Sequence, residues 1–259
     1  MRITTRQLAI ALAAIAIGLG STASAEPTDI TVRVISRDAK FIGTSMGGVQ
    51  VTLRDAYTGE LLAEGKTRGG TGDTTRIMKE PSGRSPVLAT EDAAAFRTTL
   101  DIDRPRLVEL TAQGPLAQRQ SANRVSATQW VIPGKDLSGG NGWMVELPGF
   151  VVDVLAPPTH QKRSGLPAEV TLRANVTMMC GCPIEPDGLW DANDYEVAAL
   201  LYRDGERAGV AQLEYAGETS QFAGTLQLAE PGTYEAIVYA YDRDSGNTGV
   251  DRVTFVLSP

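Results

Sequence analysis

Apolar and polar residues alternate through most of the chain after residue 26. Because successive side chains of a strand point to opposite faces, a period of two predicts half-buried β-strands. The segments are short and end at glycine, proline or asparagine, which is typical of a sandwich or barrel and not of alternating strands and helices. We expect strands at residues 30–35, 49–53, 61–64, 96–102, 107–112, 125–132, 143–147, 150–155, 170–178, 195–202, 210–215, 222–228, 234–241 and 253–257. The pattern therefore predicts an all-β protein.

Two prolines interrupt this pattern near the middle of the chain. Ala156-Pro157-Pro158-Thr159 has the composition of a stiff linker, and polar residues follow it as far as Arg163. We expect two β-sandwich domains in tandem, at residues 26–155 and 156–259. Within the first domain, residues 76–86 are polar and rich in turn-forming residues, which indicates an insertion or a mobile loop.

The first 25 residues have the pattern of a cleaved signal peptide. Arg2 and Arg6 precede an apolar run from Leu8 to Leu19, and Ala23-Ser24-Ala25 supplies the small residues of a cleavage site. We therefore expect a periplasmic or secreted protein that starts at Glu26. No later apolar run approaches the about 20 residues of a membrane span. Cleavage removes both arginines and takes the net charge from −7 to −9, which disfavours nucleic acid and anionic membranes as partners.

The motifs of the first domain are mostly turn motifs. A strand at residues 30–35 precedes Gly-Gly-Val-x-Val-x-Leu at 47–53, Thr-Gly-Glu at 58–60 and Gly-x-Thr-x-Gly-x-x-Gly at 65–72. This order resembles the carboxypeptidase regulatory-like, transthyretin-like β-sandwich, over about residues 30–75. The resemblance implies a binding or structural appendage. The glycine-rich stretch lacks the Gly-Lys-Ser/Thr ending of a phosphate-binding loop, so we interpret it as a hairpin or loop.

The second domain has its clearest motifs near the C-terminus. Pro231-Gly232-Thr233-Tyr234 is followed by Tyr239-Ala240-Tyr241-Asp242, by Gly246-Asn247-Thr248-Gly249 and by a final Val-x-Phe-x-Leu strand at 253–257. These motifs resemble the last hairpin of bacterial immunoglobulin-like domains. The resemblance implies a sandwich of about 100 residues and again concerns structure more than activity.

Enzymatic chemistry has little support in the sequence. His160 is the single histidine and lies in the expected linker, so neither a Ser-His-Asp arrangement nor a zinc site with several histidines is predicted. The acidic residues at 185–194 do not have the spacing of a calcium loop. Asp242, Asp244 and Asn247 come closer to that spacing, but no closing glutamate follows, and a β-turn is the preferred interpretation. We expect a protein that is not an enzyme.

The segment Met178-Met179-Cys180-Gly181-Cys182-Pro183 is the strongest candidate for chemistry, because it contains both cysteines of the chain. Residues two apart in an extended chain face the same way, so both thiolates could point at one ion. Soft sulfur ligands favour Cu(I). The candidate ligands are Cys180 and Cys182, with Met179 as a thioether and His160 as an imidazole if the linker folds back. Met178 continues the apolar side of its strand and is assigned to the core.

Three other interpretations of this segment remain open. The cysteines could form a disulfide, but so short a loop removes little entropy from the unfolded chain and stabilises the fold weakly. They could be buried thiols that act as small apolar residues beside core methionines. They could also lie at an interface with another chain.

The sequence therefore supports two main hypotheses for function. The first is an exported, non-enzymatic binding or accessory protein with a Cu(I)-type site and a protein partner in the cell envelope. The alternative is a structural or interaction module of the envelope in which Cys180 and Cys182 form a local disulfide. A thiol–disulfide enzyme is the weakest option, because Cys-Gly-Cys here follows a strand and does not begin a helix that would lower a thiol pKa.

Overall fold

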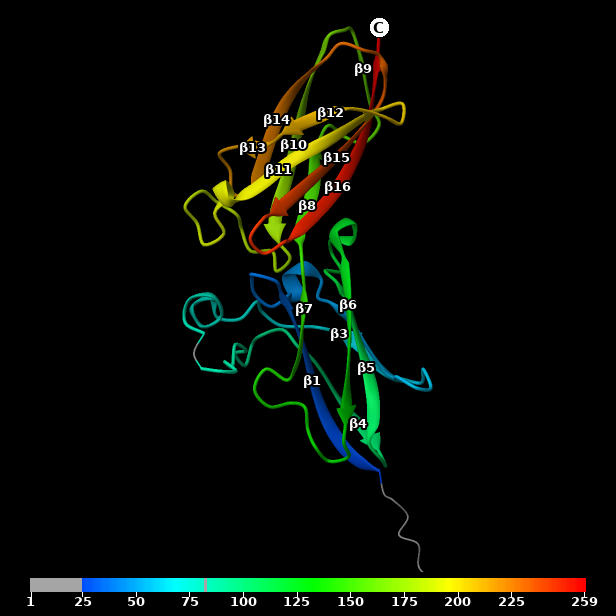
Figure 1. Ribbon diagram of the computed structural model, residues 1–259, viewed down its shortest axis with the longest axis vertical. Coiled ribbons are helices and arrows are strands. Elements are labelled where there is room, and N and C mark those ends of the chain that lie inside the picture. Colours follow the sequence, from blue (N-terminus) through cyan, green and yellow to red (C-terminus); the bar gives the residue numbers. More distant parts are fainter. Residues whose placement is uncertain (1–24, 82) are drawn as a thin grey trace, which may run out of the picture.

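The computed structural model describes residues 25–81 and 83–259. Residues 1–24, which are all but the last residue of the expected signal peptide, lie outside the described residues. Nearly every ordered element is a strand, as the alternating pattern predicts (Figure 1). The first seven strands are β1 (Glu26–Ser36), β2 (Gln50–Asp55), β3 (Leu61–Lys66), β4 (Phe96–Ile102), β5 (Arg106–Gly114), β6 (Asn123–Val131) and β7 (Trp143–Leu147). The others are β8 (Phe150–Ala156), β9 (Gln161–Ser164), β10 (Ala168–Met178), β11 (Tyr195–Arg203), β12 (Glu206–Gln212), β13 (Glu214–Tyr215), β14 (Gln221–Leu228), β15 (Gly232–Asp242) and β16 (Thr248–Ser258).

The N-terminal sandwich consists of two sheets with the strand orders β4-β1-β7 and β3-β2-β5-β6. β1 pairs antiparallel with β4 and parallel with β7, so the first and last strands of this unit lie side by side. The alternation predicted from sequence places one face of each strand in a shared core. Ile30, Val32 and Val34 of β1 face Val51 and Leu53 of β2 within that core.

The C-terminal sandwich has the strand order of an immunoglobulin-like domain. One sheet is β13-β14-β10-β8 and the other is β12-β11-β15-β16-β9. With β9 set aside, the strands β8, β10, β11, β12, β13, β14, β15 and β16 correspond in chain order to strands A, B, C, C′, D, E, F and G of an immunoglobulin-like domain. The two sheets then have the orders D-E-B-A and C′-C-F-G. Tyr234, near the start of β15, donates a hydrogen bond from its hydroxyl to the Glu230 carbonyl (2.9 Å), which is the tyrosine corner of such domains. The immunoglobulin-like expectation therefore holds at the level of topology.

The change from one sandwich to the other falls earlier than the expected linker. We expected residues 150–155 to close the first unit, but β8 pairs antiparallel with β10 of the second, Phe150 lying opposite Met178. The connection between the sandwiches is only Pro148-Gly149. The proline-rich segment 156–159 lies inside the second sandwich, between β8 and β9. β9 itself was missed, because its polar sequence pairs at the sheet edge, parallel to the end of β16.

A short π-helix at Thr75–Lys79 occupies the start of the stretch 76–86 that we expected to be an insertion or a mobile loop. Ile77 of this helix is buried in a small apolar cluster with Ile35, Phe41 and Ala89. Three short 3₁₀ turns are the other helical elements described, at Thr44–Met46, Arg119–Ser121 and Ala192–Asp194. Within the described residues, no helix has both the length and the apolar character needed to span a membrane.

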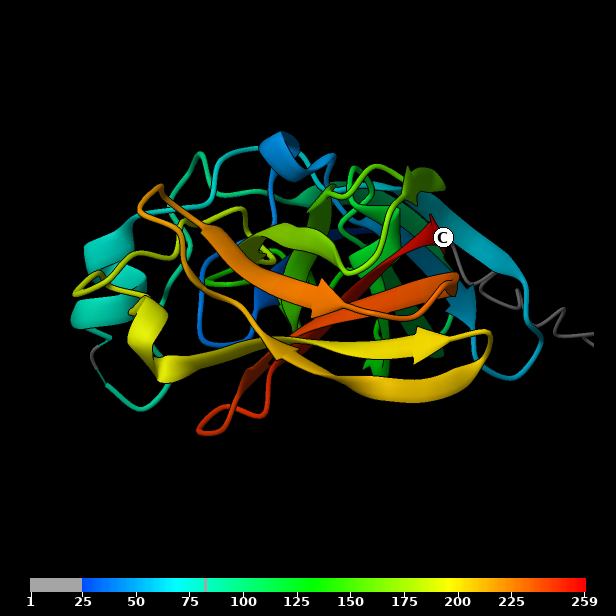
Figure 2. The same cartoon turned by 90° about the horizontal axis from the view of Figure 1, so that it is seen from above.

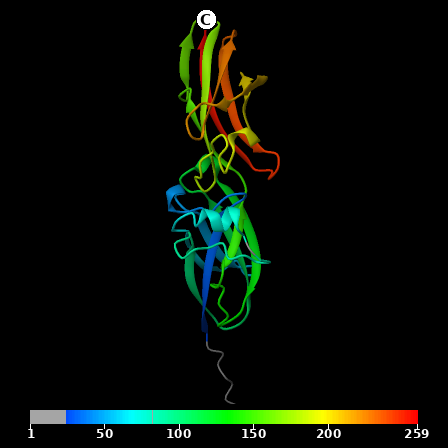
Figure 3. The ribbon, with the colours of Figure 1, turned by 90° about the vertical axis from the view of Figure 1, so that its left-hand side faces the viewer.

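The two sandwiches lie end to end, with the C-terminus at the far end of the second (Figures 1 and 3). Seen from above, along the long axis, the strands of the second sandwich lie over those of the first (Figure 2). The residues that join the two units are therefore at the middle of an elongated molecule. The Met-Cys segment follows the end of β10 at this junction.

Candidate functional site

Residues 178–182 form a tight turn at the end of β10. Met178 donates its backbone N–H to the Cys182 carbonyl (3.1 Å), and Gly181 donates its own to the Met178 carbonyl (2.8 Å). A disulfide joins Cys180 to Cys182, whose Cα atoms are 5.3 Å apart. Gly181 has a φ of 75°, a left-handed conformation that glycine adopts without steric cost. We refer to residues 178–182 as the disulfide turn.

The two methionines of the disulfide turn are buried in different hydrophobic cores. Met178 belongs to the core of the C-terminal sandwich, whereas Met179 belongs to the core of the N-terminal sandwich. Both side chains are fully buried, at 0% exposure. Adjacent residues of an extended chain point in opposite directions, so one turn can supply a side chain to each core. The disulfide turn is therefore shared by the two sandwiches.

The disulfide itself lies in the C-terminal core, with Cys180 1% and Cys182 4% exposed. Gly181, between the cysteines, is pressed against Met46 of the N-terminal sandwich. A Cβ atom at position 181 would lie 2.7 Å from the Met46 sulfur, which is too close for a larger residue without movement. The glycine therefore allows the turn to approach the other sandwich closely.

Polar contacts complete this junction. The Trp190 indole N–H donates to the Asp38 carbonyl (2.8 Å) from one sandwich to the other. Asn247 is fully buried and accepts the Gly149 backbone N–H (2.8 Å), while its amide nitrogen donates to the Arg37 carbonyl (3.2 Å). Asn247 thus ties the β15–β16 turn both to the two-residue connection and to the N-terminal sandwich.

Gly149 in the connection also has a packing role. Its φ is 128°, and a Cβ there would lie 2.8 Å from the Met179 methyl carbon and 2.9 Å from the Thr248 carbonyl oxygen. The neighbouring Pro148 carbonyl accepts a hydrogen bond from the Asn123 side chain (2.8 Å). A connection of two residues, fixed on both sides, leaves little freedom for one sandwich to turn on the other.

Two titratable groups near the junction have perturbed pKa values. Burial raises the pKa of Asp38, and the neighbouring Asp242 carboxylate raises it further. Burial is also the main cause of a raised pKa at Tyr195, to which Asp38 and Asp242 contribute. The ring of Tyr195 packs edge-on against Phe150, with centroids 5.0 Å apart. Asp38 is nevertheless exposed and Tyr195 half-buried, so these pKa shifts reflect partial desolvation beside neighbouring carboxylates.

The structure does not bring the four expected copper ligands together. Cys180 and Cys182 are bonded to each other, and Met179 is directed into the other core. His160 is exposed on the turn before β9, where its backbone N–H donates to Thr254. Thr254 lies on β16, and Gly249 of the same strand packs on Phe150, which lies opposite Met178 in the β8–β10 pair. Thr254 is five residue steps along β16 from Gly249, a distance of about 17 Å.

This donor set does not fit Cu(I) in the oxidised protein, because disulfide sulfurs lack the thiolate charge that binds the metal. Among the described residues there is also no cluster of three or more histidine, cysteine, aspartate or glutamate side chains arranged to hold a metal ion. Copper binding by the reduced pair stays a prediction. Of the interpretations of the segment, the local disulfide is the one that the structure contains, in a buried position between two domains.

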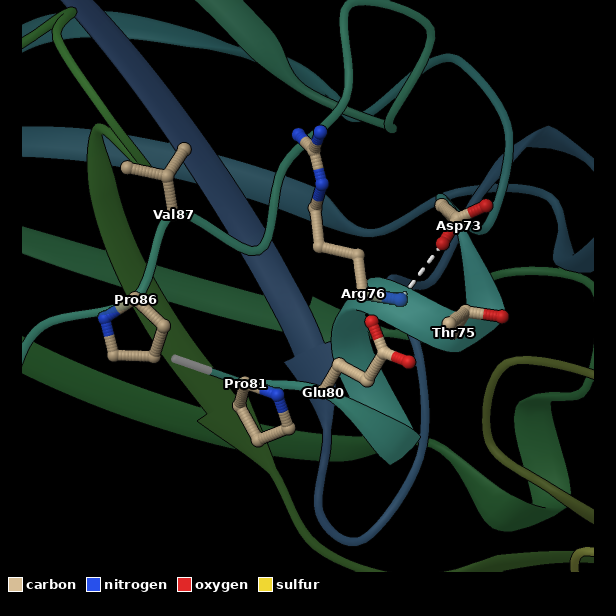
Figure 4. Close-up of a pocket in the computed structure, with 7 residues that line it drawn as sticks. All are labelled: Asp73, Thr75, Arg76, Glu80, Pro81, Pro86 and Val87. Atoms are coloured by element: carbon tan, nitrogen blue, oxygen red, sulfur yellow. Dashed lines mark hydrogen bonds between the residues drawn. The ribbon is translucent and has the colours of Figure 1, made fainter. Parts of the chain in front are cut away.

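A surface cavity of about 510 Å³ lies beside the π-helix (Figure 4). Its walls include the charged groups of Asp73, Arg76 and Glu80 and the rings of Pro81 and Pro86. The hydrogen bond drawn between lining residues runs from the Arg76 backbone N–H to the Asp73 carboxylate (2.7 Å) and caps the first turn of the helix. The Arg76 guanidinium donates to the Ala89 carbonyl (3.3 Å), so local structure accounts for the contacts of these groups.

Comparison with family models and with curated proteins finds no match. Among solved structures, the chain is similar to fibronectin(III)-like modules of CbhA from Clostridium thermocellum, with 14% identity, 92% of both chains covered and a TM-score of 0.30. It is also similar to the C-terminal domain of the Streptococcus pyogenes antigen I/II-family protein AspA, with 11% identity over 90% of this chain and 99% of that one, at a TM-score of 0.25. An engineered protein matches at 14% identity and a TM-score of 0.32 over 50% of this chain, which spans only 24% of that protein. At such TM-scores we base the fold on the strand order and contacts of the chain itself.

Several residues of the junction were missed in the sequence. Trp190, Asn247, Gly149 and Ala39 form contacts there, and Ala39 of the N-terminal sandwich is buried in the C-terminal core. Asn247 had been assigned only to a β-turn. A tryptophan within an otherwise polar loop is a signal of burial, but the sequence does not indicate which surface covers it, and an asparagine is an ordinary turn residue.

Proposed function

We propose that this chain is an exported, non-enzymatic structural or interaction module whose two sandwiches are held in a fixed relation by the disulfide turn. The observation that carries the proposal is the burial of Met178 and Met179, adjacent in sequence, in the cores of two different sandwiches. Such sharing stabilises the end-to-end arrangement of the sandwiches. A module of this kind keeps its binding surfaces at a constant spacing.

Export and the location outside the cytoplasm are part of this proposal. A buried disulfide suits an oxidising compartment, and β1 begins at Glu26, directly after the expected cleavage site. Mass spectrometry of the protein recovered from an exporting cell should give a mature N-terminus at Glu26. An intact N-terminus on soluble cytoplasmic protein would contradict export.

We also propose that the N-terminal sandwich is of the carboxypeptidase regulatory-like type. Support comes from the expected hairpin, where β2 and β3 pair around Asp55–Glu60, and from the close packing of the glycine-rich stretch. A Cβ at Gly69 would lie 2.6 Å from the Asp92 carbonyl oxygen. On this proposal the partner is a protein of the cell envelope that binds the surface of the two end-to-end sandwiches.

The decisive experiment is a thiol titration of protein purified from the exporting compartment without reductant, combined with metal analysis. We expect no free thiol in native or denatured protein and no bound copper. The Cys180→Ser/Cys182→Ser variant serves as the control for background thiol signal. Two titratable thiols together with one equivalent of copper would overturn the structural proposal and support the metal site.

A further inference from the structure

Arg33 is a buried cation in the middle of β1. Thr31, Arg33 and Ile35 share the face of β1 that points away from the main N-terminal core. Ile35 on this face packs with Ala89 and Met144, because residues 86–94 cross over it. This covering segment is held by Asn141, whose side chain accepts the Leu88 backbone N–H (2.8 Å). Arg33, on the same face of β1, is only 6% exposed.

Among the described residues, no ion pair involves the guanidinium of Arg33. Its Nε and Nη1 atoms are buried and have no hydrogen-bond partner among the described residues. Burial lowers the pKa of Arg33, and the positive charge of the neighbouring Arg97 lowers it further. A buried guanidinium is ordinarily paired with a carboxylate or another oxyanion, because its desolvation is otherwise uncompensated.

Arg33 and Arg97 line the same surface cavity, of about 580 Å³. Arg97 lies on β4 opposite Thr31 of β1, so it stands on the same side of the sheet as Arg33. The hydroxyl of Ser138 and the carboxylates of Asp29 and Glu91 also line this cavity. Asp29 is engaged by the Thr99 hydroxyl (2.6 Å), and among the described residues no ion pair joins Glu91 to either arginine.

A second cavity, of about 460 Å³, adjoins the first and shares Arg97 with it. Its walls contain Lys66, Arg68 and Phe96. None of the ion pairs among the described residues involves Arg33, Lys66, Arg68 or Arg97. In a chain of net charge −7, these four cations therefore lie near one another without ion pairs, with the carboxylates of Asp29 and Glu91 beside Arg33 and Arg97.

We propose that the cavity between Arg33 and Arg97 binds an oxyanion group, a sulfate, phosphate or carboxylate. A ligand with more than one such group places the next one against Lys66 and Arg68. The guanidinium donors match the geometry of such groups, and the buried one gains the counter-charge that it lacks. The ligand is either a free inorganic anion or an acidic oligosaccharide, since both present this chemistry. The proposal is independent of the disulfide turn.

The test uses the oxidised mature chain, residues 26–259, and sodium sulfate titrated against sodium chloride at constant ionic strength. We expect a saturable rise in Tm with sulfate for the wild type, because a ligand that binds the native state stabilises it. Arg33→Met and Arg97→Gln should weaken the apparent sulfate affinity at least tenfold. Arg124→Gln, which removes an exposed arginine from β6 of the same sandwich, should change it less than twofold. An equal response to sulfate in all four proteins would overturn the proposal.

Arg33→Met provides a second, internal readout. In chloride alone, this variant should have a higher Tm than the wild type, because it removes an uncompensated buried charge. At saturating sulfate the order should reverse. Arg97 is exposed, so Arg97→Gln should fold, and it tests the same site if Arg33→Met fails to fold. A Tm order that is the same in both salts would contradict a role for Arg33 in anion binding.

The two sources of the anion are separated with a sulfated hexasaccharide, measured by isothermal titration calorimetry. If the ligand is an oligosaccharide, Lys66→Gln/Arg68→Gln should weaken hexasaccharide binding at least tenfold and leave the response to sulfate unchanged. Sulfate binding with no added affinity for the hexasaccharide supports the Arg33 site and overturns the extension to Lys66 and Arg68. Failure of both probes to bind overturns the whole proposal.

Discussion

Met178 and Met179 are identical in type and in burial, yet they stabilise different parts of the molecule. Met178 fills the C-terminal core beside Phe150, and Met179 fills the N-terminal core beside Val151 and Leu147. The apolar alternation along its strand predicted Met178 in the core, and its burial confirms this. The same alternation placed Met179 on the opposite face as a free thioether, because the opposite face of a strand at the end of a sandwich is ordinarily exposed. Here a second sandwich covers that face.

The paired methionines give a matched test. Met179→Ala should lower the free energy of unfolding by about 2–5 kcal/mol, as other buried methionine truncations do. Native-state hydrogen exchange should show the loss of protection first in β1, β2 and β5 of the N-terminal sandwich. Met178→Ala is the control and should affect β10 and β15 first. Loss of protection confined to the C-terminal sandwich in both variants would contradict the shared turn.

Asp153 offers a test of electrostatics at a single residue. Burial raises the pKa of Asp153, and the neighbouring Asp251 carboxylate raises it further. Above the raised pKa the folded protein therefore contains an unfavourable ionised carboxylate, and this penalty disappears as the pH falls through that pKa towards the ordinary value of 3.8. Asp153→Asn should raise stability at pH 7 by less than about 1 kcal/mol.

The measurement for Asp153 is Tm as a function of pH, from 7 down to 3, by circular dichroism. The gain from Asp153→Asn should shrink steadily as the pH approaches 3. Asp101→Asn, on an exposed position of β4, is the control. A gain that grows towards acid pH would show that the ionised Asp153 is stabilising and would contradict the burial argument.

At the scale of elements, the sequence predicted most strands well because each strand has one face in a core. β7 and β11 were placed within a residue of their observed bounds, since alternation and flanking turns agree there. β9 was not predicted, because an edge strand of four polar residues has no apolar face to reveal it. Residues 76–86, which are mostly polar, were interpreted as an insertion or a mobile loop, although Ile77 and Met78 anchor a short helix in a small apolar cluster.

The disulfide turn gives a prediction at this scale. Closing so short a loop removes little entropy from the unfolded chain, so Cys180→Ala/Cys182→Ala should cost only about 1–2 kcal/mol of stability. Urea denaturation measures the loss, and reduction of the wild-type protein should reproduce most of it. A loss larger than that of Met179→Ala would show that the disulfide, and not the buried methionine, holds the turn.

At the scale of the whole molecule, the two-residue connection and the buried side chains of the junction restrict motion between the sandwiches. Asn247 is fully buried and its polar contacts cross this junction, so their loss leaves the Gly149 N–H and the Arg37 carbonyl without this partner. A buried amide in such a position specifies one arrangement of the two units.

Asn247→Ala should therefore lower stability by about 1–3 kcal/mol and increase the independent tumbling of the two sandwiches. Nuclear magnetic resonance relaxation of the backbone amides measures the tumbling of each sandwich separately. Asn141→Ala is the control: it removes hydrogen bonds to Leu88 and Ala89 within the N-terminal sandwich, away from the junction. Unchanged joint tumbling in Asn247→Ala would contradict its role at the junction.

The sequence by itself determined the fold class, the positions of most strands and the immunoglobulin-like topology of the second sandwich. The fold class and the strand positions follow from local alternation and turn chemistry, which each segment contains on its own, whereas the immunoglobulin-like topology was implied by the resemblance of the motifs at residues 231–257. The tertiary structure decided where one sandwich ends, what covers Met179 and why the cysteines are buried. Those outcomes depend on the contact of two surfaces, residues 36–46 of one sandwich and the disulfide turn of the other, that are far apart in the chain. No local pattern encodes that contact, because an apolar side chain at the end of a strand has the same sequence signature whether water or a second domain lies beyond it.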